Sequence, residues 1–432
     1  MTTIINNEHK KLNFSNEREQ SHACLNSAEH EKNQGRKVLN VPNLRFPEFK
    51  GEWEKCTLGN NVKIQGGYAF KSELFLRKGI PIIRISNLPQ NASFVDLDDC
   101  TYYKEGNYNS FEVHNGDLLI AMSGATTGKT AIYNRKTLAY LNQRVGLFKS
   151  TNRDSLYYPF LYALVSTPVF KRQLSTRLIA GAQPNISSSD IESIRISIPQ
   201  KNEQEKIAHL MLLLDERITT QNKIIEDLKK LKSAIIDYAI NSLDSGFVKF
   251  GSLYEMAGEG GTPTTSNASF YDNGKIPFIK IDDLKKKYLT ENKDFITELG
   301  LQKSSAWLVP SRSILFSNGA TIGEITITTY PVCTKQGILG IVPKPNIDVE
   351  FLYYFMSSSY FKKAVSRIVT EGTMKTAYLK DINNIRCPIP IKEKQQDIAK
   401  MPSALNSKID FEQSILKLFC SQKQYLLCQM FM

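Results

Sequence analysis

The sequence has few of the side chains from which metal and catalytic centres are usually built. Only five histidines occur among its 432 residues, and three of them, His9, His22 and His30, lie in the first 40. Its seven cysteines are an odd number, and no two are spaced Cys-x-x-Cys. Closely spaced histidines and cysteines are typical of zinc sites, and an even set of cysteines is typical of a disulfide framework. We therefore expect scattered reduced thiols, no metal site and no cofactor bound by this chain itself.

Long apolar runs are also missing. The stretch Ile207–Leu214 is interrupted by His209, whereas a membrane-spanning helix needs about 20 apolar residues. The N-terminus carries Glu8 and Lys10 but no apolar core like that of a secretory signal. We therefore expect a cytoplasmic protein without membrane contact.

Acidic side chains are too few to balance the basic ones. Lys and Arg number 55 against 43 Asp and Glu, which gives a formal net charge of +12 at pH 7. Residues 1–40 hold six basic and five acidic residues and few large apolar ones, so they are predicted to form a disordered tail. Nearly all of the positive excess therefore belongs to the remaining body, and it favours an anionic partner.

The body repeats itself once, which is the most informative feature of the sequence. Residues 81–88 (PIIRISNL) return as 277–284 (PFIKIDDL), shifted by 196 positions. Residues 124–128 (GATTG) return as 319–323 (GATIG), shifted by 195, and residues 190–199 return as 381–390, shifted by 191. Three matches in one order at nearly one spacing predict a duplicated domain with a connecting element.

Each copy combines two kinds of pattern. Short β-rich runs such as 117–122 and 145–148 alternate with turn signals, and a helical stretch covers 158–174 in the first copy and 349–365 in the second. After Pro199 and Pro390 apolar residues recur at alternating steps of three and four, as in long coiled-coil helices. The sequence predicts a mixed α/β (α+β) fold, divided into a tail (1–40), a first mixed domain (41–200), a first long helix (201–242), a second mixed domain (243–391) and a second long helix (392–432).

The two predicted helices carry matching apolar stripes. Polar residues interrupt both stripes at the same places, at Gln221 and Lys232 in the first and at Glu412 and Lys423 in the second. Because polar residues in a helix seam fix register and partner, we expect these helices to pair with each other or with a partner helix. Pro402 is predicted to kink or delay the second helix. The predicted seam residues are Ile207, Leu214, Ile218, Ile225, Leu228, Ile235, Ile398, Leu405, Ile409, Leu416 and Leu426.

No motif in the chain convincingly performs chemistry. Residues 124–130 (GATTGKT) have one residue too few between their glycines for a phosphate-binding loop, and the second copy continues with Glu324 after Gly323. The shared glycines instead predict a tight turn with positive φ. The Asn-Pro-Pro or Asp-Pro-Pro motif of base methyltransferases does not occur, and residues 291–293 match a nuclease-like acid-x-Lys pattern no better than residues 48–50 do. We therefore predict no catalytic residue.

Together these features resemble the specificity subunit of type I restriction-modification systems. The resemblance covers residues 41–432. It is carried by residues 41–49 (VPNLRFPEF) with Trp53 and Leu58-Gly59, both Gly-Ala-Thr-x-Gly turns, Asn142-Gln143 with Lys335-Gln336, residues 203–207 (EQEKI) with 394–398 (KQQDI), and the closing residues 426–431.

The resemblance implies a non-catalytic role in DNA recognition. The two mixed domains would be target-recognition domains that each read half of a split double-stranded DNA sequence. The helices would form an antiparallel coiled coil that sets the gap and docks two modification (methyltransferase) subunits. S-adenosylmethionine, ATP and Mg would be bound by these and by the restriction (translocase/endonuclease) subunits, which methylate adenine or cleave the DNA.

Candidate DNA-contacting residues are polar or basic side chains in matched turns, above all where the two copies differ. For example, Lys129 corresponds to Glu324, and Arg144 corresponds to Gly337. Such side chains can pair with base edges or phosphates. The full set is Thr127, Lys129, Thr130, Gln143, Arg144, Gln183, Asn185, Ser187, Lys285, Lys286, Lys287, Thr321, Lys335, Gln336, Lys375 and Thr376.

Two other functions stay open on the sequence alone. A stand-alone DNA methyltransferase or nuclease would need its own methyl-donor or metal site. A scaffold protein without a DNA role would carry its basic charge incidentally.

Overall fold

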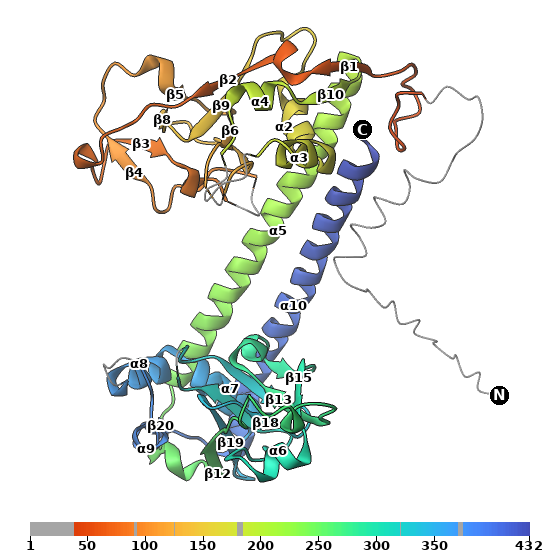
Figure 1. Cartoon of the computed structure of the whole chain (residues 1–432). Helices are drawn as coiled ribbons and strands as arrows, with labels where there is room; N and C mark the ends of the chain where they lie inside the picture. Colours follow the sequence, from red (N-terminus) through yellow and green to blue (C-terminus); the bar gives the residue numbers. More distant parts are fainter. Residues whose placement is uncertain (1–38, 90–92, 125, 179–184, 320, 370–374) are drawn as a thin grey trace, which may run out of the picture. The chain divides into compact units, whose positions relative to one another are not determined.

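The computed structural model describes residues 39–89, 93–124, 126–178, 185–319, 321–369 and 375–432 (Figure 1). It divides into two compact units, Met1–Thr219 with Lys417–Met432 and Thr220–Leu416. The two long helices α5 (Lys201–Asn241) and α10 (Lys392–Gln429) contribute to both units. The predicted tail, except for Leu39 and Asn40, lies outside the described residues. No helix in the described ranges is long and apolar enough to cross a membrane.

The first unit contains two four-stranded sheets. One is antiparallel and has the order β2 (Val62–Gly66), β9 (Val145–Ser150), β6 (Leu118–Ala121) and β7 (Thr130–Ile132). The other has the order β4 (Thr101–Tyr103), β3 (Ile80–Ile83), β8 (Ala139–Leu141) and β5 (Glu112–Val113), and its β3–β8 pair is parallel. A separate pair, β1 (Glu54–Thr57) with β10 (Arg195–Ile198), joins the start of the domain to its end.

The sequence of strand β6 is entirely apolar because both of its faces are buried. Side chains alternate between the two faces of a strand, and Leu119 and Ala121 pack into the cluster that contains Ile83 and Leu141 of the second sheet. Leu118 and Ile120 face the other way, into the cluster that contains Phe160 of a helix. Because both faces of β6 are covered, polar residues would have no exposed position on it.

The second unit repeats this arrangement. Its larger sheet has the order β12 (Tyr254–Glu259), β19 (Ile338–Pro343), β16 (Ile314–Ser317), β17 (Ile325–Thr328) and β14 (Tyr288–Leu289). A three-stranded sheet has the order β15 (Asp294–Ile296), β13 (Ile276–Ile279) and β18 (Cys333–Thr334), and β11 (Phe247–Lys249) pairs with β20 (Arg386–Pro388). The mixed fold with two tandem domains is therefore confirmed.

The predicted helical stretches 158–174 and 349–365 are each divided in two. The first forms α2 (Tyr158–Ser166) and α3 (Pro168–Ser175), and the second forms α7 (Val349–Ser357) and α8 (Ser359–Ile368). Thr167 and Ser358 lie at the breaks with extended backbone, and their hydroxyls accept from the backbone N–H of Phe170 and Phe361 at 3.2 Å each. Both predicted stretches are therefore helical, and an N-cap at the same place in each copy begins a second helix there.

A buried glutamine attaches each long helix to its domain. Gln204 accepts from the Tyr157 backbone N–H at 2.8 Å and donates to the Pro199 carbonyl at 2.8 Å. Its counterpart Gln395 accepts from Asp348 and donates to Pro390 at the same distances. Both side chains are almost fully buried, so the repeated glutamine fixes the direction in which the helix leaves the domain.

The residues before β1 and the end of α10 both pack on the start of α5. Arg45 forms a two-bonded ion pair with buried Glu203, both contacts at 2.7 Å, and the Trp53 indole donates to the same carboxylate at 3.3 Å. The Glu203 hydrogen bond raises the pKa of Arg45 above its already high value. The rings of Trp53 and Phe431 lie 6.2 Å apart. These contacts explain why the start and the end of the body carry recognisable motifs.

Helices α5 and α10 pair in antiparallel fashion, through contacts inside each unit. Asp215 binds Lys423 at 2.5 Å in the first unit, and in the second unit Gln221 donates to Glu412 and Lys232 donates to Asn406 at 3.0 Å. Higher numbers on α5 pair with lower numbers on α10, as antiparallel helices require. The polar residues that interrupt the predicted stripes therefore bind across the helix pair, as expected for groups that fix its register.

The predicted seam agrees with the observed burial. All eleven predicted seam residues are buried or half-buried, with Ile207, Ile225 and Ile409 among the most enclosed. Pro402 does not delay the second helix, because α10 begins ten residues before it, at Lys392. The missing N–H of a proline removes only one hydrogen bond of the helix, and Pro402 is a buried residue of the second unit.

The Asp215–Lys423 pair predicts a graded response to substitution. Asp215→Ala would leave the largely buried Lys423 ammonium without its partner and should lower the free energy of unfolding by about 3 kcal/mol. Asp215→Asn should lower it less, because the equivalent pair in the second unit is Lys232 with Asn406. Urea unfolding midpoints of the two variants measure the difference in their free energies of unfolding. Equal losses of stability would contradict the equivalence of the Asp215–Lys423 and Asn406–Lys232 pairs.

Candidate DNA interface

Three of the predicted loop segments meet at one place in the first unit. The backbone N–H of Met122, just before the glycine turn, donates to the Arg144 carbonyl at 2.9 Å. The Ile186 N–H donates to the Met122 carbonyl at 3.0 Å, and Ser123 forms a bridge with Asn185. The turn at 124–130, the turn at 143–144 and the segment at 185–187 are therefore neighbours.

The second unit builds the same frame from the equivalent residues. Asn318 takes the place of Met122: its N–H donates to the Gly337 carbonyl at 3.0 Å, and its carbonyl accepts from Ala377 at 2.9 Å. Lys335 donates to Ile279 at 2.9 Å, just as Asn142 donates to Ile83 at 3.1 Å. One backbone arrangement therefore presents different side chains in the two domains.

The glycine turn has the predicted geometry. Gly124 and Gly128 have φ of +79° and +86°, and Gly323 has φ of +109°, whereas Gly319 does not adopt positive φ. The Thr127 hydroxyl donates to the Gly124 carbonyl at 2.6 Å, which closes the turn. The turn has three residues between its glycines instead of four, and its second copy carries Glu324 in place of Lys129, so the two copies do not share a phosphate-binding loop.

Most of the candidate side chains at these loops reach the surface. Gln143, Arg144, Asn185, Ser187, Thr321, Lys335, Gln336 and Lys375 are exposed, and Thr127, Lys129, Thr130 and Thr376 are half-buried. Gln183 lies outside the described residues. Ser187 also caps the short helix α4 (Ser188–Glu192) by accepting from the Asp190 N–H at 3.1 Å. Hydrogen bonds from Ser187 lower the pKa of Asp190.

The predicted Lys285–Lys287 cluster does not present three free charges. Lys285 pairs with Asp282 at 2.9 Å and Lys286 with Glu291 at 3.2 Å, all on the surface. Hydrogen bonding and charge from the partner raise the pKa of Lys285 and lower that of Asp282. Both pairs are exposed, so they contribute little to stability.

Lys287 is a correction to the prediction, because it lies inside the second domain. Only 2% of its side chain is exposed, and its ammonium contacts the Glu350 carboxylate and the Ser403 hydroxyl, the latter at 2.9 Å. The ammonium also lies 4.7 Å from the centre of the Tyr354 ring. These contacts join β14 to α7 and α10, and they leave Lys287 unavailable to a phosphate.

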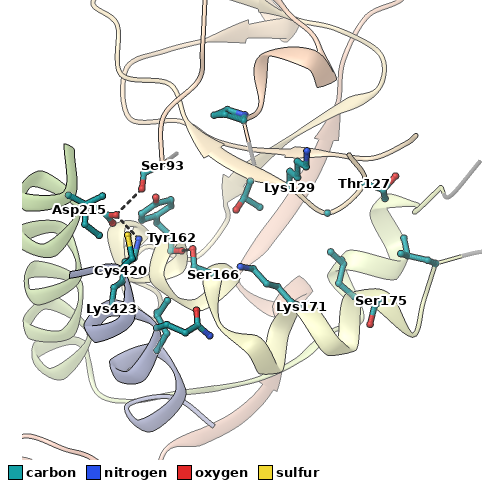
Figure 2. Close-up of a pocket in the computed structure, with 18 residues that line it drawn as sticks. Ser93, Thr127, Lys129, Tyr162, Ser166, Lys171, Ser175, Asp215, Cys420 and Lys423 are labelled. Carbon is teal, nitrogen blue, oxygen red and sulfur yellow. Dashed lines mark hydrogen bonds and ion pairs between the residues drawn. The ribbon is translucent and has the colours of Figure 1, made fainter. Parts of the chain in front are cut away.

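A pocket of about 560 Å³ lies beside the glycine turn of the first domain (Figure 2). Its lining includes Thr127, Lys129 and Thr130 of the turn, Lys171 of α3, and Asp215 and Lys423 of the long helices. Asp215 also accepts from the Ser93 hydroxyl at 2.8 Å. Burial raises the pKa of Tyr162 on the same wall, and the charge of Asp215 adds to this effect.

Reasoning from the sequence missed Lys171, Asp215 and Lys423 as members of a site. They lie on helix faces without a motif, and no pattern along the chain places them near the glycine turn. One signal was present, since Lys171 and Lys423 have lysine counterparts in the other copy, Lys362 and Lys232. In the described part of the chain no three His, Cys, Asp or Glu side chains are grouped so that they could hold a metal ion.

The fold defines a duplicated α+β domain carried on an antiparallel helix pair. The chain belongs to the type I restriction modification DNA specificity domain family, whose model matches residues 50–230 and again residues 243–418. The two matches correspond to the two copies of the repeat.

The chain aligns with individual relatives over most of their length. The chain is 25% identical over 405 residues to the putative type I restriction enzyme MjaX specificity subunit of Methanocaldococcus jannaschii, which covers 87% of this chain and 92% of that protein. It is 24% identical over 393 residues to the type I restriction enzyme EcoBI specificity subunit of Escherichia coli, with 83% and 80% covered. The fold is similar to the S subunit of the type I restriction-modification system from M. genitalium, with a TM-score of 0.56, 17% identity, and 91% of this chain and 99% of that chain covered.

The buried position of Lys287 gives a test that separates it from its neighbours. Lys287→Met should lower the free energy of unfolding by about 3 kcal/mol, because the Glu350 carboxylate loses its partner. Lys285→Met removes the same charge from an exposed pair and should leave the urea unfolding midpoint unchanged. Equal midpoints for the two variants would show that Lys287 is not held inside the domain in solution.

Proposed function

We propose that this chain is the non-catalytic specificity subunit of a type I restriction-modification complex. Each domain reads one half of a split double-stranded DNA target, and partner subunits methylate adenine or cleave the DNA. The observation that carries this proposal is the shared backbone frame around Met122 and Asn318, on which the two copies place different side chains. A duplicated reader with divergent loops suits a target made of two different half-sequences.

The charge of the chain supports contact with DNA. The net charge of +12 belongs almost entirely to the body of the chain. The exposed candidates Arg144, Lys335 and Lys375 lie at the convergent loops, where side chains of this type bind phosphates or base edges. A scaffold without a DNA role would not need basic side chains gathered at the variable edge of each domain.

The long helices offer a surface for the modification subunits. Besides the seam, α5 exposes Ile224, Leu231 and Tyr238, and α10 exposes Phe411, Leu418 and Tyr425, each set at steps of seven residues. Leu418 and Tyr425 are 63% and 60% exposed. Stripes of this kind on the outside of a helix pair suit the docking of partner helices.

Catalysis and its cofactors belong to the partners in this proposal. S-adenosylmethionine would be bound by the two modification subunits, and ATP and Mg would be used by the restriction subunits. This chain would contribute the choice of DNA sequence and the spacing between the half-sites. A stand-alone methyltransferase or nuclease is the alternative, and purified chain that methylates or nicks DNA by itself would establish it.

Co-expression with the modification subunit tests the function directly. Single-molecule sequencing of methylated adenines should show one two-part motif separated by a fixed gap, because two readers on one helix pair contact the duplex at two places. A single contiguous motif, or no methylation at all with the partner present, would contradict the proposal.

The same assay includes a variant that should affect one half-site only. Arg144→Ala removes an exposed guanidinium whose counterpart in the second domain is Gly337. If Arg144 reads a base, discrimination at one position of the first half-site should fall by about 1 to 3 kcal/mol, and the second half-site should stay unchanged. The control is Arg144→Lys, which keeps the charge but not the paired hydrogen bonds. Loss at both half-sites would indicate a general effect on affinity instead.

Docking of the modification subunits predicts a separate effect. Leu418→Asp should reduce co-purification of the modification subunit at least tenfold, since burial of a leucine side chain contributes about 1.5 to 3 kcal/mol. Gln422→Asp introduces the same charge on the exposed part of α10 and should retain the partner. Equal retention by both variants would place the docking surface elsewhere. Circular dichroism checks that α10 stays folded.

A further inference from the structure

The pocket beside the glycine turn of the first domain is lined by cationic and hydroxyl-bearing side chains from the turn, from α2 and α3, and from α10. Figure 2 shows Lys171 extending across the pocket from α3 toward Ser166 and Tyr162, with Lys129 on the β6–β7 hairpin. Lys423 of α10 forms the third basic position. Hydroxyls of Thr127, Thr130, Ser166 and Ser175 also line the pocket.

The charges in this pocket are not balanced by the protein. It is lined by three lysines and one carboxylate, Asp215, which is already bound to Lys423 at 2.5 Å. Neither the Lys129 ammonium nor the Lys171 ammonium has a hydrogen-bond or ion-pair partner among the residues that the structure describes. The pocket therefore carries an excess of two positive charges next to a neutral pair, a charge state that suits an anionic group.

The surroundings of Lys171 are unfavourable to its own charge. Burial lowers the pKa of the Lys171 ammonium, and the positive charge of Lys423 lowers it further. An anion placed between these lysines would reverse both effects, because it stabilises the charged form of each.

The second domain gives an internal comparison at the equivalent position. Its pocket of about 430 Å³ is lined mainly by apolar side chains, such as Phe316 and Met356, but also by Ser366 and Lys375. Lys362 takes the place of Lys171, but Glu324 stands where Lys129 does, and Ile322 and Ile325 replace Thr127 and Thr130. The second pocket therefore keeps two basic positions, Lys362 and Lys375, but lacks the lysine and the hydroxyls that the glycine turn contributes in the first domain.

We propose that the first-domain pocket holds a phosphate group of the DNA backbone beside the first half-site, with Lys129 and Lys171 as its charged ligands. This inference rests on the proposed function for the source of the phosphate. The pocket adjoins the glycine turn, and the backbone hydrogen bond from Met122 to Arg144 holds that turn next to the loop that carries Arg144. A DNA strand that is read by Arg144 would therefore pass beside the pocket. Lys171 then fixes the position of the duplex and carries no sequence information, as is typical of phosphate contacts.

The test uses the full chain with its modification subunits and a duplex that carries the motif found by methylation sequencing. The dependence of the binding constant on salt is measured for the wild type, Lys171→Gln and Lys171→Arg. Lys171→Gln should weaken binding and reduce the slope of log K against log salt by about 1, since one phosphate contact is lost. Lys171→Arg should restore the slope, and all three proteins should methylate the same motif.

A charge-matched control is Lys55→Gln on β1, which lies outside the pocket and should leave the slope unchanged. A slope that falls equally in Lys55→Gln, or an altered motif in Lys171→Gln, would overturn the proposal. Duplexes with one neutral methylphosphonate at successive positions should weaken the wild type at a phosphate beside the first half-site and have no further effect on Lys171→Gln. Equal weakening of both proteins at every position would overturn it as well.

A free anion is distinguished by calorimetry with inorganic phosphate. Saturable binding of inorganic phosphate that Lys171→Gln abolishes, together with an unchanged salt slope, would assign the pocket to a free anion and overturn the DNA assignment. Failure of the proposed function has a different signature, because the wild type would then methylate no two-part motif with its partner, whatever the result of the phosphate titration.

Discussion

The hydrogen bond between Gln221 and Glu412 joins α5 to α10, the equivalent helix of the second copy. Glu412 is the residue 191 positions after Gln221, so the two equivalent residues face each other across the pair. The neighbouring polar contacts are also made by equivalent residues, because Asp215 and Lys423 in the first unit correspond to Asn406 and Lys232 in the second. The antiparallel pairing of α5 with α10 therefore uses equivalent positions of the two copies, although one of them carries Asp215 in the first copy and Asn406 in the second.

The shared frame explains how one fold can serve two recognition tasks. Backbone hydrogen bonds, such as those of Met122 and Asn318, fix where the loops lie and do not depend on side-chain identity. Buried glutamines and hydroxyl caps at matched positions hold the helices in the same orientation in both copies. Selection on the scaffold and selection on the exposed loop side chains can therefore act on different residues of one domain.

The duplication and the helix pair could be predicted from the sequence because both are periodic signals. The position of Lys287 could not, since the run of three lysines at 285–287 looks uniform along the chain. Lys287 immediately precedes β14, and its carbonyl accepts from Ile327 of β17, which directs its side chain toward the core and α10, whereas Lys285 and Lys286 lie in the preceding loop. The division of each helical stretch was signalled by Pro168 in the first copy, but in the second only the capping role of Ser358 reveals it.

The two units solve the same electrostatic problem with different residues. Ser93 and Lys287 occupy equivalent places, because each carbonyl accepts from the matched isoleucine of the next strand, Ile132 or Ile327. In the first unit the neutral Ser93 lies against Asp215, which is balanced by Lys423. In the second unit the charged Lys287 brings its own carboxylate partner, Glu350, and the helix position equivalent to Asp215 is the neutral Asn406.

A buried charge is stable only with a nearby partner. The change from Ser93 to Lys287 between the copies is therefore linked to the change from Asp215 to Asn406, because each unit has to balance its own buried charges. Burial lowers the pKa of Lys232, whose hydrogen-bond partner Asn406 is neutral, although Asp410 acts in the opposite direction. The first unit keeps its carboxylate on the long helix and the second keeps it on α7. This arrangement leaves Lys129 and Lys171 beside the first-domain turn without a protein counter-charge, while the corresponding pocket in the second domain is lined mainly by apolar side chains. The difference in side-chain chemistry between the two copies therefore extends from the exposed loops into the junction of each domain with its helix.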